Sequence, residues 1–160
     1  MQSGGEIRID PARLGRHPVG TDPHSAPLEL VLPYTDTALA RASLQRAALL
    51  SAGLLVSVTL VAVHVVPFPA DFHCPSSEHA FLVNELMGLA AESPLPVSPQ
   101  VVLARSRDEG FRYALPPEST VLVGTYRHLW RTGEERLARR LAADGHNVAL
   151  LRFEPGKLSL

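Results

Sequence analysis

Cysteine is almost absent from this sequence, since Cys74 is the only one among its 160 residues. A single thiol can form neither an intrachain disulfide nor a zinc site made of several cysteines. We therefore expect a reducing compartment, of which the cytoplasm is the simplest choice.

An excess of charge of one sign is also lacking, because 15 Lys and Arg residues face 16 Asp and Glu residues, for a net charge of −1. Such a balance creates no overall field that would attract nucleic acid or an anionic membrane. We expect no nucleic-acid partner. The opening MQSGGEIRIDPARLGRHPVG lacks the apolar stretch of a signal peptide, so we expect no secretory address.

One stretch, 47–66, lacks Asp, Glu, Lys and Arg and is long enough to span a bilayer. Gly53 interrupts it where a helix would stop, and the residues beyond are dense in β-branched side chains, as in buried parallel strands. Basic clusters and a Trp or Tyr belt are missing from its ends. We therefore expect the end of a helix followed by a buried strand, and no membrane insertion.

The composition that is present, 46% hydrophobic and 19% charged, is typical of a globular protein. The length suits a single domain. Glycines and prolines without apolar periodicity predict a flexible N-terminal arm over 1–26. The α/β domain is expected at 27–155, followed by a short tail at 156–160.

Strand and helix patterns alternate along this domain. Strands are predicted at 28–32, 56–66, 97–104, 119–124 and 146–153, and helices at 35–53, 77–91, 108–115 and 133–145. Such alternation predicts a doubly wound, mainly parallel sheet of five strands with helices on both faces.

Three local features refine this prediction. Asp36 or Thr37 is expected to cap the first helix. Pro99 lacks an N–H, which predicts that its strand lies at a sheet edge. Glutamates that recur every seven residues predict a solvated helix face, and they are Glu78, Glu85 and Glu92.

Three motifs resemble the universal stress protein family, and together they cover roughly 28–154. LVLPYTDTALARASLQRA resembles the opening strand and helix, LVAVHVVPFP the second strand, and STVLVGTYRHLWRTGEERLARRLA the fourth strand, phosphate loop and last helix. The resemblance implies an adenine nucleotide α-hydrolase-like fold. It also implies that Asp36 contacts the nucleoside, that His64 and Val65 end beside the adenine pocket, and that Gly124 is the first loop glycine.

The phosphate loop departs from the family pattern. Arg127 and Leu137 stand where further glycines are usual, and Gly133 is a substitute followed by Glu134 instead of a hydroxyl residue. Thr132 and Glu135 have the spacing of a capping box, which competes with phosphate for helix amides. The candidate nucleotide pocket is therefore Asp36, Val65, Gly124, Arg127 and Gly133, with ATP or AMP as its ligand. We expect no cofactor bound in the family's usual mode.

The function expected from this resemblance is that of a homodimeric regulatory or binding module, not an enzyme, with a protein partner as a further prospect. The last strand, 146–153, is expected to pair with its copy, as it does in the family. Two alternatives stay open. One is an ATP- or AMP-binding stress switch or weak nucleotide hydrolase, and the other is a regulatory partner of a membrane transporter.

Other groupings of reactive residues carry less weight. His73, Cys74 and His79 match no common zinc spacing. A hydrolytic triad of Asp36, His64 and Ser106 lacks a nucleophile elbow.

The last candidates are basic and aromatic side chains near the C-terminus. A solvated helix face accounts for Arg136, Arg139 and Arg140. Trp130 and Tyr126, with Arg127, His128 and Arg131, place residue types common in interface hot spots in the loop that should be glycine-rich.

Overall fold

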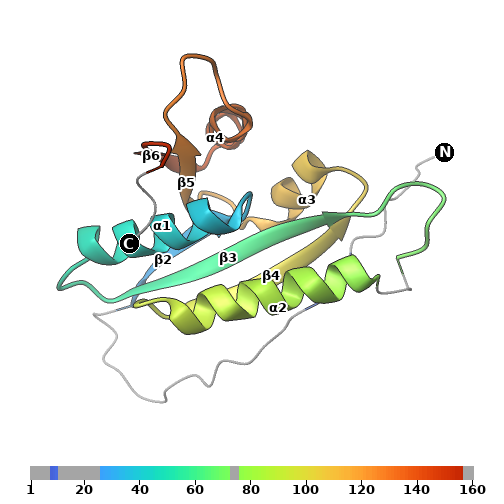
Figure 1. Ribbon diagram of the computed structural model, residues 1–160, viewed down its shortest axis with the longest axis horizontal. Helices are drawn as coiled ribbons and strands as arrows, with labels where there is room; N and C mark the ends of the chain where they lie inside the picture. The colour runs from blue at the N-terminus through green and yellow to red at the C-terminus, as the bar shows by residue number, and fades with distance from the viewer. Residues whose placement is uncertain (1–7, 11–25, 73–75, 157–160) are drawn as a thin grey trace.

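The computed structural model describes residues 8–10, 26–72 and 76–156 and contains one six-stranded sheet with the strand order β1-β4-β3-β2-β5-β6 (Figure 1). The strands are β1 (Arg8–Asp10), β2 (Leu28–Pro33), β3 (Val56–Val65), β4 (Val97–Ala104), β5 (Thr120–Tyr126) and β6 (Asn147–Phe153). The helices are α1 (Thr37–Leu50), α2 (Ser77–Glu92), α3 (Arg107–Ala114) and α4 (Gly133–Ala143). Strands β2 to β6 are mutually parallel, which confirms the predicted doubly wound α/β class.

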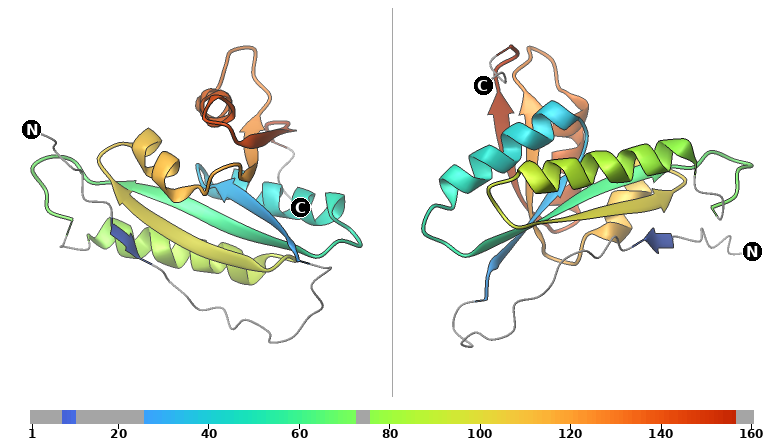
Figure 2. Two further views of the ribbon diagram at one scale, coloured as in Figure 1. Left: turned by 180° about the vertical axis from the view of Figure 1, so that it is seen from behind. Right: turned by 60° about the horizontal axis from the view of Figure 1, so that its bottom comes forward.

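Helices cover both faces of the sheet, each over its own apolar core (Figure 2). Helices α1 and α2 pack with Leu44 and Leu86 over Leu60 of β3. Helices α3 and α4 pack with Phe111 and Leu141 on the opposite face. Successive side chains of a strand alternate between faces, so β2, β3 and β5 contribute to both cores.

The uncharged stretch 47–66 is divided between a helix and a strand, as expected. Helix α1 ends at Leu50, Gly53 adopts a φ of +84°, and β3 begins at Val56. Only a residue without a Cβ adopts such a left-handed φ at low cost, which is why the helix stops there. Among the residues that the structure describes, no helix combines the length and apolarity needed to cross a bilayer.

The predicted N-terminal arm contains one unexpected element. Arg8–Asp10 form β1, which pairs antiparallel with Val101–Leu103 of β4. The other residues of the arm up to 25, and the tail beyond Gly156, lie outside the described residues. A three-residue strand leaves too little periodicity for sequence analysis to detect.

The pairing of β1 also corrects the position predicted for β4. This strand is the edge of the parallel sheet but is flanked by β1 over its carboxyl half. The Val58 N–H donates to the Pro96 carbonyl, so by alternation Ser98 and Gln100 face β3 and the Pro99 nitrogen faces outward. Pro99 therefore lies where its missing N–H removes no ladder bond, ahead of the segment that β1 covers.

The glutamate repeat of α2 is not a uniformly solvated face. Glu85 is half-buried and accepts hydrogen bonds from the Tyr34 hydroxyl at 2.9 Å and the Thr37 hydroxyl at 2.6 Å. Glu92 pairs with Arg41 of α1, with 3.0 Å between Oε2 and Nε. Glu85 and Glu92, which are seven residues apart, both face α1. A helix that packs beside another helix carries charged residues along the border of the contact, and these residues recur at the same spacing as residues on a solvent-exposed face.

Candidate functional site

The strand order reverses between β2 and β5, since the chain builds β3 and β4 on one side of β2 and then crosses to β5 and β6 on the other. Open α/β sheets bind ligands at such a point, outside the carboxyl ends of the strands. Two connections meet here, namely the turn between β2 and α1 and the loop between β5 and α4. The candidate residues Asp36, Gly124, Arg127 and Gly133 belong to this region.

Of the two predicted caps, Asp36 and not Thr37 is the N-cap of α1, and its carboxylate is already engaged. Oδ1 accepts from the Leu39 N–H at 3.0 Å and from the Tyr126 hydroxyl at 3.4 Å. Burial and the neighbouring Asp36 carboxylate raise the pKa of Tyr126, which keeps this hydroxyl protonated and able to donate. A contact between the turn that follows β2 and the last residue of β5 thus crosses the reversal point through side chains of the chain itself.

Gly124 lies inside β5, two residues before the strand ends, and not in a loop. A Cβ at this position would collide with the Ser43 hydroxyl of α1, whose side chain is buried. The missing side chain therefore serves the packing of α1 on the sheet. A glycine that allows a helix to pack closely and a glycine that allows a phosphate to approach look the same in the sequence, so spacing alone cannot distinguish the two roles.

Arg127 begins the loop after β5. Its N–H extends the ladder by donating to the Phe153 carbonyl at 2.8 Å, and its Nη1 lies 3.8 Å from Oε1 of Glu154. Arg127 and Arg131 are both exposed. The loop closes at its far end where the hydroxyls of Thr125 and Thr132 lie 2.7 Å apart.

Gly133 is the first residue of α4, and Thr132 is the N-cap. The Thr132 hydroxyl accepts from the Glu135 N–H at 3.1 Å, which is the predicted half of the capping box. The Glu135 carboxylate lies 3.6 Å from Nε of Arg152. The space where a Cβ of Gly133 would stand is open, so close packing does not require a glycine there.

Val65 and His64 end β3, on the far side of β2 from the loop after β5. Val65 is exposed and lies opposite Ala104 of β4. The His64 Nε2 is 3.2 Å from the hydroxyl of Ser76, the N-cap of α2, and its ring meets the His79 ring edge-on. Burial lowers the pKa of His64, and the nearby His79 lowers it further, whereas Glu78 raises it.

The structure does not assemble the triad of Asp36, His64 and Ser106. Ser106 caps α3 by accepting from the Glu109 N–H at 3.2 Å, Asp36 caps α1, and His64 pairs with Ser76. His73 and Cys74 lie outside the described residues. Within 8–10, 26–72 and 76–156, no group of three or more His, Cys, Asp or Glu side chains could hold a metal ion.

Sequence reasoning missed two polar clusters at the same edge of the sheet. Tyr34, Thr37 and Glu85 form a closed triangle of hydrogen bonds that ties α1 to α2. Burial raises the pKa of Tyr34, hydrogen bonding to Thr37 opposes this, and the Glu85 carboxylate raises the pKa again. In the sequence only the closeness of Tyr34 and Thr37, three residues apart, indicates a shared position, and it identifies no partner on α2.

Arg105, directly after β4, organises the second cluster. Its Nη1 donates to the carbonyls of Val66, Pro67 and Ala70 at 3.0, 3.3 and 2.9 Å. The guanidinium also lies 4.1 Å from the ring centres of both Phe68 and Phe72. One side chain from β4 thus holds the loop that follows β3. An arginine in the stretch Ala-Arg-Ser-Arg gives no signal of this role in the sequence.

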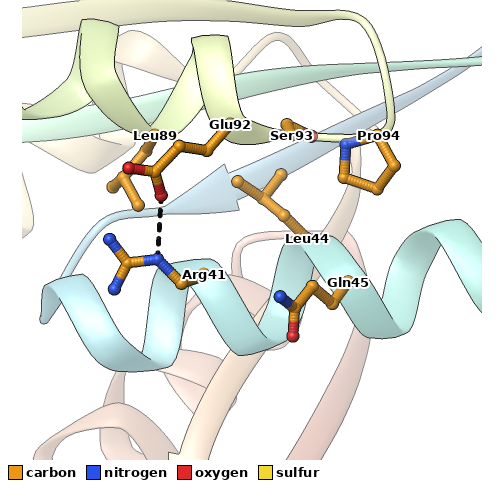
Figure 3. A pocket seen from close by; sticks show the side chains of 7 residues that line it. All are labelled: Arg41, Leu44, Gln45, Leu89, Glu92, Ser93 and Pro94. Carbon is orange, nitrogen blue, oxygen red and sulfur yellow. Dashed lines mark hydrogen bonds and ion pairs between the residues drawn. The ribbon is translucent and has the colours of Figure 1, made fainter. Parts of the chain in front are cut away.

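A cavity of about 40 Å³ lies between α1 and α2, with the Arg41–Glu92 ion pair across it (Figure 3). Its lining residues are Arg41, Leu44, Gln45, Leu89, Glu92, Ser93 and Pro94. Sites for small molecules usually measure roughly 300–1,000 Å³. This cavity has room for a few waters and not for a nucleotide.

No protein-family model matches the sequence, and no curated protein is significantly similar to it.

Proposed function

We propose that this chain is a universal stress protein-like regulatory module that acts as a homodimer and does not bind ATP in the family's usual mode. One observation carries the proposal. At the reversal point of the sheet, the candidate groups are engaged by the chain itself, since Asp36 binds Leu39 and Tyr126, and the place of a Gly124 Cβ is filled by Ser43.

The first turn of α4 also opposes phosphate binding. Phosphates bind at helix N-termini because free amides and the positive end of the helix dipole attract anions. Here the Thr132 hydroxyl takes the Glu135 amide, and the carboxylates of Glu134 and Glu135 add negative charge in the same turn. Capping and charge each contribute on the order of 1 kcal/mol, so together they weaken phosphate binding about tenfold to a hundredfold.

Nucleotide content tests this part of the proposal. Purified protein should release no stoichiometric ATP, ADP or AMP on denaturation, and calorimetry should detect weak ATP binding or none. A variant with Arg127→Gly, Glu134→Ser and Glu135→Ala should gain affinity, and Asp36→Asn, which keeps a capping oxygen, should remove the gain. Micromolar ATP binding by the wild-type chain would instead establish the nucleotide switch.

The proposed dimer is supported by the position of β6. This strand lies at the sheet edge, and the Asn147 N–H donates to the Ser119 carbonyl, so by alternation Val148, Leu150 and Arg152 turn their N–H groups outward. A row of unpaired backbone groups is a template for pairing with a second copy.

Light scattering tests the dimer with two substitutions of one residue. Arg152→Pro removes an outward N–H without removing a ladder bond to β5, and it should convert the dimer to a monomer. Arg152→Ala removes the same exposed side chain but keeps the N–H, and it should stay dimeric. A wild-type protein that is monomeric at high concentration would contradict the dimer.

The nucleotide switch is retained as a second candidate because one observation favours it. The space beside Gly133 is open, and the exposed Arg127 and Arg131 lie in the loop that leads to it. These side chains could hold an anion that the backbone amides do not.

A further inference from the structure

The loop between β5 and α4 presents two adjacent apolar side chains to solvent. Leu129 is 101% exposed and Trp130 is 86% exposed, the highest values among the large hydrophobic residues that the structure describes. Figure 1 shows this loop projecting beyond the carboxyl end of the sheet. Single exposed apolar residues are ordinary, but a tryptophan beside a leucine at the tip of a projecting loop is a strong indication of a contact surface.

The exposure is built into the loop, because both ends of the loop are fixed. At one end the Arg127 N–H donates to Phe153 of β6, and at the other the Thr132 hydroxyl pairs with Thr125 and caps α4. The four residues 128–131 therefore turn outside the sheet, and the left view of Figure 2 shows the loop between β5 and α4 projecting from it. Leu129 and Trp130 are held away from both cores.

The charge of the tip differs from that of the whole chain. The five residues Arg-His-Leu-Trp-Arg at 127–131 contain two arginines and no carboxylate, whereas the chain has a net charge of −1. Of the nearest carboxylates, Glu154 lies 3.8 Å from Arg127, and Glu135 is engaged with Arg152. Glu134 follows at the start of α4. The tip thus places apolar side chains outermost and basic ones on both flanks.

This arrangement, with apolar side chains outermost and basic side chains beside them, favours binding to a lipid surface over binding to a protein partner. A convex tip needs a partner that supplies a pocket, whereas a bilayer accepts it at any point. Tryptophan is enriched in the headgroup region, where its ring is buried and its N–H finds a polar partner. Arginine stems extend along apolar surface and place the guanidinium at lipid phosphates, which carry the negative charge that the tip attracts.

We propose that residues 127–131 dock on an anionic phospholipid bilayer, with Leu129 and Trp130 in the headgroup region and Arg127 and Arg131 at lipid phosphates. The contact is peripheral and does not span the bilayer, and it does not require pairing through β6. Because the whole chain has a net charge of −1, we expect the apolar pair to contribute most of the affinity for the bilayer and the two arginines to contribute less.

Tryptophan fluorescence reports this contact directly, because Trp130 is the only tryptophan in the chain. Vesicles of phosphatidylcholine and phosphatidylglycerol in equal parts should shift its emission to the blue, and brominated acyl chains should quench it. Leu129→Ser should weaken binding about tenfold. Arg127→Ala and Arg131→Ala should each weaken it about fivefold on the mixed vesicles and leave binding to pure phosphatidylcholine unchanged.

Co-sedimentation can test the Trp130 variant, which has no tryptophan left for a fluorescence measurement. Trp130→Ser should remove the chain from the vesicle pellet, while Leu50→Ser, in the exposed end of α1, should sediment like the wild type. The proposal is overturned if the wild type neither sediments nor shifts its emission with mixed vesicles. Loss of binding in Leu50→Ser but not in Trp130→Ser would overturn it as well, and so would equal binding to both lipid compositions.

Discussion

Two loops at the carboxyl edge of the sheet carry large aromatic side chains and differ in how these side chains are engaged. In the loop after β3, the rings of Phe68 and Phe72 each lie 4.1 Å from the guanidinium of Arg105, which follows β4 and donates to three carbonyls of the loop. In the loop after β5, Leu129 and Trp130 face solvent. The comparison teaches that an arginine from a neighbouring strand can anchor a loop whose aromatic side chains stay largely exposed, since Phe68 is 78% exposed. The described residues show no such anchor on Leu129 or Trp130.

Arg105→Ala should have the largest effect. It removes charge-assisted hydrogen bonds and two cation–π contacts at a half-buried position, and we expect the free energy of unfolding to fall by about 2–3 kcal/mol. Urea denaturation measures this change. Arg105→Lys keeps the charge but not the planar fork, and should fall between wild type and alanine. Equal stability of all three would mean that the loop does not depend on Arg105.

Gly124→Ala tests the strand that leads into the second loop. The added methyl group meets the Ser43 hydroxyl, and overpacking of this kind costs about 1–3 kcal/mol. Ser43→Ala in the same chain should restore part of the loss, which thermal unfolding of the single and double variants would reveal as a coupling energy. Additive losses would show that the glycine serves some other purpose, with a ligand as the first candidate.

The sequence predicted the fold far better than these contacts. Alternating strand and helix patterns placed five strands and four helices within a few residues, and the caps Asp36 and Thr132 were read correctly, because each depends on residues close in the chain. The Arg105 cluster, the Tyr34–Glu85 bond and the Ser43–Gly124 contact join residues that are far apart. A local sequence pattern does not indicate which distant residue will contact a given side chain. Strand β1 was missed for another reason, because three residues are too few to produce a recognisable pattern.

His64 gives the closure of the first loop a pH dependence. A hydroxyl closes each loop, Ser76 on His64 in one and Thr132 on Thr125 in the other, and of these two contacts only the first contains an imidazole. The folded pKa of His64 lies below its unfolded value of about 6.5, so the unfolded chain binds the proton first as the pH falls.

The stability that His64 contributes is therefore present above pH about 6.5 and is lost as the pH falls through the folded pKa. His64→Gln should flatten the stability profile between pH about 7.5 and about 5.5, whereas Thr125→Val should lower it evenly at both. Denaturation at the two pH values measures this difference. An imidazole that titrates above its ordinary pKa in NMR spectra would contradict the prediction.

Leu129→Ser and Trp130→Ser should change stability least, by less than about 0.5 kcal/mol, because exposed side chains lose little on substitution. Thermal unfolding in the absence of lipid measures this. A loss above about 1 kcal/mol would mean that the tip packs on the domain, and the contrast between the two loops would disappear.

Because of Pro99 and β1, the two edges of the sheet differ in their ability to pair with a strand from another chain. At the β4 end, Pro99 has no N–H to offer, and the three-residue strand β1 covers the segment that follows it. Short strands and prolines are common means by which proteins protect a sheet edge from pairing with another chain. At the β6 end, seven residues lie open along one side in the part of the chain that the structure describes. A subunit with one closed and one open end can add a single neighbour by strand pairing. The proposed pairing through β6 would therefore stop at two copies and would not propagate into a fibre.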